Sequence, residues 1–99
     1  MVWHRLRACK LVVLLQPSYN RIYMNFFGGP DNIIKQSGIQ DGTMIADFGC
    51  GTGAYTLALS KLFRASHIFA IDVQKPLLEH LAAEAHREHL NNIETVWAD

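Results

Sequence analysis

The stretch "MIADFGCGTGAYTLALSKLF", residues 44–63, decides the fold of this 99-residue chain. It opens on a short apolar run, residues 44–48, and continues into a loop in which every second residue is glycine, residues 49–53. The run has the length of a buried parallel strand, and residues 54–63 repeat their apolar side chains at helical spacing. A strand, a glycine loop and a helix in this order are typical of an α/β domain that binds a ligand against its backbone.

The same alternation continues to the end of the chain. Residues 67–72 and 93–99 have strand character, and residues 74–90 between them carry the apolar stripe of an amphipathic helix. Right-handed crossovers give these strands the order 3-2-1, which is one half of a doubly wound sheet. We therefore predict an α/β fold, a Rossmann-like doubly wound parallel sheet (β-α-β-α-β) present as its N-terminal half. The strand at 44–48, central in a complete sheet, is expected to form an open edge.

The sequence before this unit is less regular. Residues 1–16 are predicted to form a short helix that Pro17 interrupts, and "PDNIIKQSG", residues 30–38, has the marks of another short helix. We interpret residues 1–27 as a helical or irregular N-terminal segment and residues 28–99 as a partial domain. A complete doubly wound sheet needs further strands, so we expect this chain to be the front part of a larger protein, with pairing to another chain as the alternative.

Composition and charge narrow the class of protein. The chain is 49% hydrophobic and 18% charged with zero net charge, which is typical of a globular protein. The first 30 residues hold four bases and no acid, a small basis for a contact with nucleic acid. The longest apolar run, residues 11–15, is far shorter than the roughly 20 residues of a membrane span. Cys9 and Cys50 make no disulfide framework, so a cytoplasmic location is expected.

Two classes of cofactor are bound by a strand, a glycine loop and a helix. For dinucleotides, Gly49, Gly51 and Ala54 satisfy the G-x-G-x-x-G/A pattern. Asp72 follows the loop at about the 20-residue distance where an acid binds a ribose diol. The second class is S-adenosylmethionine (SAM), which lacks a phosphate and carries an ammonium and a sulfonium. Asp47 favours SAM, because a carboxylate beside a pyrophosphate would repel it in a partly desolvated cleft.

Two strings of this sequence resemble a known family. "IADFGCGTGAYTLALSKL" resembles motif I of class I SAM-dependent methyltransferases, and "IFAIDVQKPLLEHL" resembles the acidic segment that follows it there. The resemblance covers residues 28–99, and is greatest to methyltransferases of the ubiquinone and menaquinone biosynthesis type. It implies transfer of a methyl group from SAM to an acceptor, for which this chain supplies the cofactor-binding part.

The resemblance leaves several points open. A small-molecule acceptor is expected, a nucleic-acid acceptor is not excluded, and the oligomeric state is not specified. Two other functions stay as alternatives. The first is a fragment that binds SAM without catalysis of its own, and the second is a fragment of an NAD(P)-binding oxidoreductase.

The resemblance also implies a role for each matching position. Asp47 would interact with the methionine amino group of SAM, and Asp72 would bind both ribose hydroxyls. Val73 would pack against the adenine, and Ala98 and Asp99 lie where the family's third-strand end touches the adenine, the Asp often on its amino group. The backbone of the loop would lie against the methionyl and ribose parts of SAM, through Gly49, Cys50, Gly51 and Gly53.

No residue of the sequence is identified as catalytic. The family's acceptor-binding residues come mostly after the fourth strand, which this sequence does not include. Cys50 has no base near it in the sequence, so we interpret it as a small loop residue and not a nucleophile. His86 and His89, three residues apart on one helix, could pair on a metal, but no third ligand is evident and no metal is predicted. The histidines of this helix, assigned to a solvated face, are His80, His86 and His89. Three aromatic residues are interpreted as core residues, with a lid over the site as the alternative: Tyr23, Phe26 and Phe27.

Overall fold

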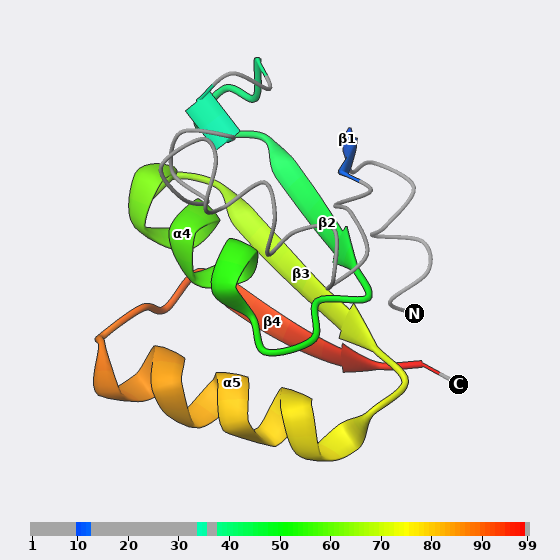
Figure 1. Cartoon of the computed structure of the whole chain (residues 1–99). Helices are drawn as coiled ribbons and strands as arrows, with labels where there is room; N and C mark the ends of the chain where they lie inside the picture. Colours follow the sequence, from blue (N-terminus) through cyan, green and yellow to red (C-terminus); the bar gives the residue numbers. More distant parts are fainter. Residues whose placement is uncertain (1–9, 13–33, 36–37, 99) are drawn as a thin grey trace, which may run out of the picture.

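The computed structural model describes residues 10–12, 34–35 and 38–98 (Figure 1). In this part of the chain, strands and helices follow one another from the N-terminal to the C-terminal end. They are β1 (Lys10–Val12), β2 (Met44–Phe48), α4 (Ala54–Leu62), β3 (His67–Asp72), α5 (Lys75–Arg87) and β4 (Ile93–Trp97). None of the described helices is long and apolar enough to cross a membrane.

All the described strands belong to one parallel sheet with the order β1-β2-β3-β4. The neighbours β2, β3 and β4 are the three strands that the sequence predicts, in the predicted order. Asp47 on β2 lies opposite Ala70 on β3, and Asp72 on β3 lies opposite Trp97 on β4. Because the strands are parallel, their carboxyl ends meet at one edge of the sheet (Figure 1).

Strand β1 corrects the expectation for the N-terminal part. The sequence predicts a helix there, but Lys10–Val12 form a strand that pairs with β2, with Val12 opposite Asp47. The edge expected to be open at β2 is therefore paired, because its backbone N–H and C=O groups bond to another strand. Within the predicted helix 30–38, residues 34–35 are helical. The other predictions for the N-terminal part lie outside the described residues, including those for Tyr23, Phe26 and Phe27.

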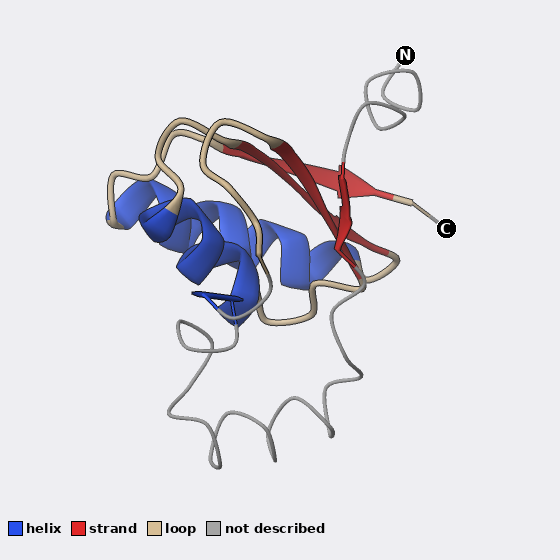
Figure 2. Ribbon diagram, turned by 90° about the horizontal axis from the view of Figure 1, so that it is seen from above, coloured by secondary structure: helices blue, strands red, loops and turns tan. Residues whose placement is uncertain are grey.

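Helices α4 and α5 lie on the same face of the sheet (Figure 2). This follows from two right-handed crossovers that proceed in the same direction. The core between α4 and the sheet is made of buried apolar side chains: Ile34, Ile45, Tyr55, Ala58, Leu59 and Ile68. A second apolar cluster comes from the alternate strand positions, whose side chains point to the other face: Ala46, Phe69 and Ile71.

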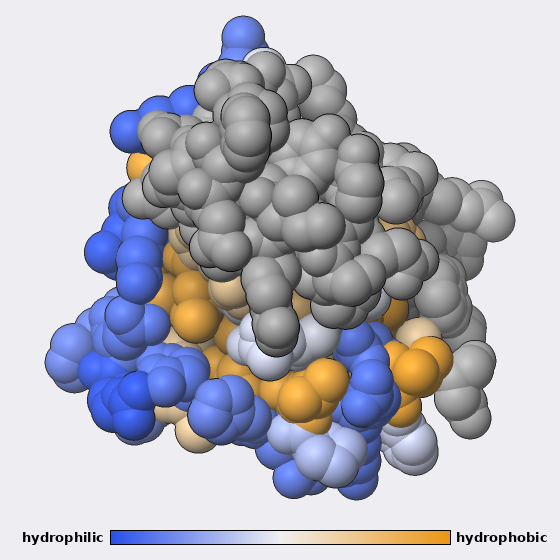
Figure 3. All heavy atoms as spheres, viewed as in Figure 1, coloured by the Kyte–Doolittle hydropathy of each residue, from blue (hydrophilic) through white to orange (hydrophobic). Residues whose placement is uncertain are grey.

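Helix α5 shows the predicted amphipathic character. Its buried residues are Leu78, Leu81 and Ala85. Hydrophilic residues gather at the lower left of the surface in Figure 3, where α5 lies in the same view in Figure 1. The helix ends at Arg87, earlier than the predicted residue 90. His89 adopts a left-handed conformation with φ 58°, and the Leu90 N–H donates to the Ala85 carbonyl at 2.8 Å. This turn brings Leu90 back into the core, where it is buried.

A buried amide fixes the opposite end of the sheet, away from the carboxyl ends of the strands. Asn92 donates from its side-chain nitrogen to the carbonyl oxygens of Phe63, at 3.0 Å, and Ser66, at 3.1 Å. The Ser60 hydroxyl donates to the side-chain oxygen of Asn92. One side chain thus joins the end of α4 to the start of β4, and holds the layers in register.

Candidate functional site

The candidate site lies at the carboxyl ends of the central strands. Asp47 and Asp72 are next to the last and the last residue of β2 and β3, respectively, which are neighbours in the sheet. The glycine loop leaves β2 at this edge, and a short turn leaves β3 beside it (Figure 1). In open α/β sheets, ligands bind in the crevice outside these strand ends. The structure therefore brings the two predicted acids and the predicted loop together.

The glycine loop folds back onto the end of β3. The N–H groups of Gly49 and Cys50 both donate to the Ile71 carbonyl oxygen, at 2.8 and 3.1 Å. Within the loop, the Gly53 N–H donates to the Cys50 carbonyl at 3.0 Å. The three glycines have φ angles of 70°, 56° and 87°. Side chains with a Cβ rarely adopt this left-handed region, so the path of the loop requires glycine at these positions.

The glycines differ in what surrounds them. A Cβ added to Gly49 or Gly51 would meet no atom within 4 Å, whereas one added to Gly53 would lie 2.4 Å from a methyl carbon of Leu81. Gly53 thus lets the start of α4 pack closely against α5. The resemblance assigns all three glycines to the cofactor, and the structure adds a packing requirement at Gly53. The open space lies at Gly49 and Gly51.

Asp47 is a buried carboxylate with one side-chain donor. It is 1% exposed, and its Oδ2 accepts a hydrogen bond from the Thr56 hydroxyl at 2.7 Å. Burial raises the pKa of Asp47 to about 6, against the lowering effect of the Thr56 hydrogen bond, and the charge of Asp72 raises it further. At neutral pH the group is thus mostly ionised in a poorly solvating place. A cation placed beside it would be stabilised.

Asp72 is held by the backbone. Its Oδ2 accepts from the Gly51 N–H at 2.9 Å, and its Oδ1 accepts from the Gln74 N–H at 2.8 Å. Its own carbonyl accepts from the Ala98 N–H at 3.1 Å. One residue thus connects the glycine loop, the turn into α5 and the end of β4. Each carboxylate oxygen has a second lone pair, which can accept a hydroxyl of a ligand.

The turn after Asp72 presents an apolar side chain to solvent. Val73 is 62% exposed, and its carbonyl accepts a hydrogen bond from the indole N–H of Trp97 at 2.9 Å. Ala98 packs against the apolar cluster on the face opposite to α4. Asp99 lies outside the described residues. Val73 thus exposes an apolar side chain directly after Asp72.

Cys50 does not have the properties of a nucleophile. Burial raises the pKa of its thiol to about 12, and the charges of Asp47 and Asp72 contribute to the rise. The thiol therefore stays protonated at neutral pH.

The histidines predicted for a solvated face are exposed, at positions 80, 86 and 89. Within residues 34–35 and 38–98, no three His, Cys, Asp or Glu side chains are grouped to hold a metal ion.

Sequence reasoning missed two polar residues in the first turn of α4. Thr56 is fully buried and bonds to Asp47, and Tyr55 is buried with its hydroxyl unbonded among the residues that the structure describes. Burial raises the pKa of Tyr55, and the charge of Asp47 raises it further. The available signal was the polar residue Thr56 among the apolar positions that follow the glycine loop.

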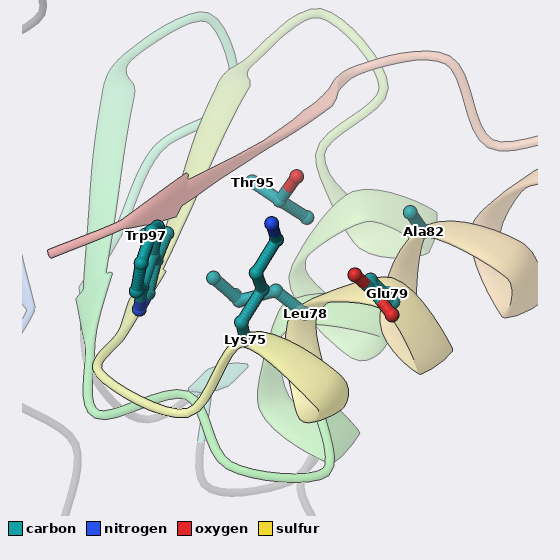
Figure 4. Close-up of a pocket in the computed structure, with 6 residues that line it drawn as sticks. All are labelled: Lys75, Leu78, Glu79, Ala82, Thr95 and Trp97. Atoms are coloured by element: carbon teal, nitrogen blue, oxygen red, sulfur yellow. The ribbon is translucent and has the colours of Figure 1, made fainter.

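A separate groove lies between α5 and β4 (Figure 4). Its lining residues are Lys75, Leu78, Glu79, Ala82, Thr95 and Trp97. The Lys75 Nζ lies 5.2 Å from the centre of the Trp97 ring, a cation–π contact. None of the acids or glycines of the candidate site lines this groove, so the two features are distinct.

Comparisons with known proteins connect this geometry to a family. Residues 45–99 match the sequence model of a family described as a methyltransferase domain. The chain is 31% identical over 65 residues to (S)-coclaurine N-methyltransferase of Thalictrum flavum subsp. glaucum, covering 66% of this chain and 18% of that protein. The chain thus spans about a fifth of the length of this curated relative.

Solved structures agree with the sequence match. A coclaurine N-methyltransferase bound to N-methylheliamine and S-adenosylhomocysteine (SAH) is similar with a TM-score of 0.68 and 31% identity, over 71% of this chain and 21% of that one. A SAM-dependent methyltransferase from Aquifex aeolicus is similar with a TM-score of 0.69 and 25% identity, over 87% of this chain and 48% of that one. The fold described above is therefore the fold of these enzymes.

Proposed function

This chain belongs to the class I SAM-dependent methyltransferases, and from that premise we propose that it binds SAM at the carboxyl ends of β2, β3 and β4. The buried carboxylate of Asp47 is the observation that carries this proposal. Its pKa is raised to about 6 by burial, and the neighbouring charge that affects it is another carboxylate, Asp72. A cationic group of a ligand would reduce the repulsion between these two carboxylates, whereas a pyrophosphate would increase the repulsion.

Each remaining part of the site fits one part of SAM. The lone pairs of Asp72 that are not used by Gly51 and Gln74 would accept the two ribose hydroxyls. The exposed side chain of Val73 would pack against the adenine, with Ala98 directly after the neighbouring strand β4. Asp99 keeps the role at the adenine that the resemblance implies. The open space at Gly49 and Gly51 would let the backbone approach the ligand.

Methyl transfer demands alignment more than acid–base chemistry. When bound, SAM would supply a methyl group on its sulfonium: the acceptor would form a bond to the methyl carbon, the carbon–sulfur bond would break, and SAH would leave as the thioether. The residues of this chain would hold the amino group at Asp47 and the ribose at Asp72, on either side of the sulfonium, and so orient the reacting carbon. For the whole protein we propose a methyltransferase activity on a small molecule, which is the activity that the name of the coclaurine relative gives for that protein. We also propose a cytoplasmic setting and a cofactor domain that begins near residue 28.

Titration calorimetry with SAH and with NADH tests the proposal. SAH is the better probe than SAM, because it shares the same contacts and cannot transfer a methyl group. We expect SAH to bind the 99-residue chain and NADH not to bind. Binding of NADH without SAH would favour the oxidoreductase alternative and contradict the proposal. Binding of SAH without activity on any acceptor would leave the alternative of a non-catalytic SAM-binding fragment.

A pair of variants locates the binding at the proposed residues. Asp72→Ala removes the acceptors for the ribose hydroxyls and is expected to weaken SAH binding by about 1–3 kcal/mol. Glu79→Ala in the groove between α5 and β4 is the matched control, because it also removes a carboxylate and lies outside the site. Equal effects of the two substitutions would contradict the assigned site.

A further inference from the structure

We propose that Tyr55 is a second binding residue for the cationic amino group of SAM, beside Asp47. This inference rests on the proposed function. Tyr55 lies in the first turn of α4, two residues after the last glycine of the loop. Its side chain is 4% exposed, and its hydroxyl has no hydrogen-bond partner in the part of the chain that the structure describes. A buried hydroxyl without a partner destabilises a fold, so its presence calls for a reason.

The packing of the core explains the ring of Tyr55 but not its hydroxyl. The ring belongs to the apolar cluster with Ile34, Ile45 and Ile68. A phenylalanine would fill the same space without burying an oxygen. The hydroxyl is thus the atom that needs an explanation, and its removal leaves the apolar contacts of the ring in place.

The first turn of α4 lies against the end of β2. The residue after Tyr55 is Thr56, whose hydroxyl donates to Asp47 at 2.7 Å. The charge of Asp47 also raises the pKa of Tyr55, in addition to the larger effect of burial. The tyrosine hydroxyl is therefore within electrostatic reach of the carboxylate that is assigned to the amino group of SAM.

The charge of the site favours a cationic group as the ligand that Asp47 and Tyr55 both contact. The charge of Asp47, which reaches Tyr55, repels a further anion, so the carboxylate of the methionyl group is disfavoured near Tyr55. An ammonium group has three N–H donors. Asp47 already accepts from Thr56 at one oxygen and can take one of these donors at the other. The Tyr55 oxygen can accept a second, after a small shift of the first turn of α4 that opens the hydroxyl to the ligand.

Tyr55→Phe tests this role in the full 99-residue chain with two ligands. SAH contains the amino group, and 5′-methylthioadenosine shares its adenine, ribose and sulfur but lacks the amino acid part. We expect Tyr55→Phe to weaken SAH binding by roughly tenfold, the effect of one hydrogen bond to a charged group. Binding of 5′-methylthioadenosine is expected to stay unchanged. The thermal midpoint of the variant without ligand is expected to rise, because an unbonded hydroxyl is lost.

Ser60→Ala is the matched control. It also removes a hydroxyl from a buried side chain of α4, but this hydroxyl bonds to Asn92 at the far end of the helix. We expect a lower thermal midpoint and an unchanged ratio of the two ligand affinities.

The outcomes separate this inference from the function on which it rests. Equal SAH affinity in the wild type and Tyr55→Phe would overturn the inference alone. An equal loss of affinity for both ligands would also overturn it, as would a lower thermal midpoint for Tyr55→Phe, which would reveal a structural partner of the hydroxyl. A wild-type chain that does not bind SAH would instead overturn the proposed function.

Discussion

The neighbouring strands β2 and β3 each carry an aspartate at their carboxyl end, but the two carboxylates accept hydrogen bonds from different kinds of donor. Asp47 receives a hydrogen bond from the hydroxyl of Thr56, and burial raises its pKa to about 6. Asp72 accepts two hydrogen bonds, both from backbone N–H groups, those of Gly51 and Gln74. A hydroxyl can be removed by substitution, and a backbone donor cannot. Asp47 is therefore the group of the site whose charge can be tuned, and Asp72 is fixed by the course of the chain.

The loop that follows β2 passes close to α5 at Gly53, and this contact is expected to give the largest effect of a substitution on stability. We expect Gly53→Ala to lower the free energy of unfolding by about 3 kcal/mol, from overpacking and a left-handed backbone together. The added Cβ would lie 2.4 Å from Leu81. Gly51→Ala has open space and should cost only about 1–2 kcal/mol for its backbone. Urea unfolding measures both, and equal costs would contradict the packing role of Gly53.

Removal of the charge at the end of β2 should stabilise the protein. The folded-state pKa of Asp47 is raised from 3.8 to about 6, so protonation favours folding. The contribution of Asp47 to stability is then greatest below about pH 4, decreases as the pH rises through 6, and is constant above. Asp47→Asn should abolish this decrease and raise the free energy of unfolding at pH 7 by about 2 kcal/mol. Urea unfolding between pH 4 and 7 checks this, and a destabilised variant would contradict the account.

Replacement of the aspartate at the end of β3 by asparagine should lower the free energy of unfolding, whereas the same replacement at the end of β2 should raise it. Asp72→Asn keeps one acceptor oxygen but places an amino group against the second backbone N–H. We expect the free energy of unfolding to fall by about 1.5 kcal/mol at pH 7. Amide hydrogen exchange at Gly51 and Gln74 should increase at the same time, because these groups donate to Asp72. Stabilisation by both asparagine substitutions would remove the distinction between the two acids.

The smallest expected effect comes from the hydroxyl that supports Asp47. Thr56→Val should raise the pKa of Asp47 above about 6 and lower the free energy of unfolding at pH 7 by about 1 kcal/mol. The pH range in which stability decreases should shift upward accordingly. Thr56→Ser keeps the hydroxyl and is the control. A pH dependence that is the same in all three proteins would show that Thr56 does not tune Asp47.

The sequence predicts the parts of this fold that depend on local pattern. Strands 44–48 and 67–72 have their predicted bounds, because each is a short, mostly apolar run with loop or turn residues before and after it. The end of α5 was less predictable, since a histidine at position 89 takes the left-handed conformation that glycine usually takes. Strand β1 could not be predicted, because it forms by pairing with a strand more than 30 residues away.

The candidate site also has features that the sequence predicts and features that depend on tertiary packing. The two acids and the glycines were predicted, because their residue types and spacing repeat a known pattern, and the structure brings them to one edge. The support of Asp47 by Thr56 was not predicted, since it depends on how α4 packs against β2. The same is true of the buried hydroxyl of Tyr55 and of the contact between Gly53 and Leu81. Tertiary packing, and not the motif, sets the electrostatics of the site.

Titration of the isotope-labelled chain with SAH, followed by amide NMR, tests the central claim most directly. The account predicts that the amide signals at both strand ends move together and saturate at one ligand per chain. These are the signals of the loop 49–53, the turn 73–74 and Ala98. Shifts confined to the groove at Lys75, Glu79 and Trp97, or no shifts at any SAH concentration, would contradict a SAM site at the ends of β2, β3 and β4.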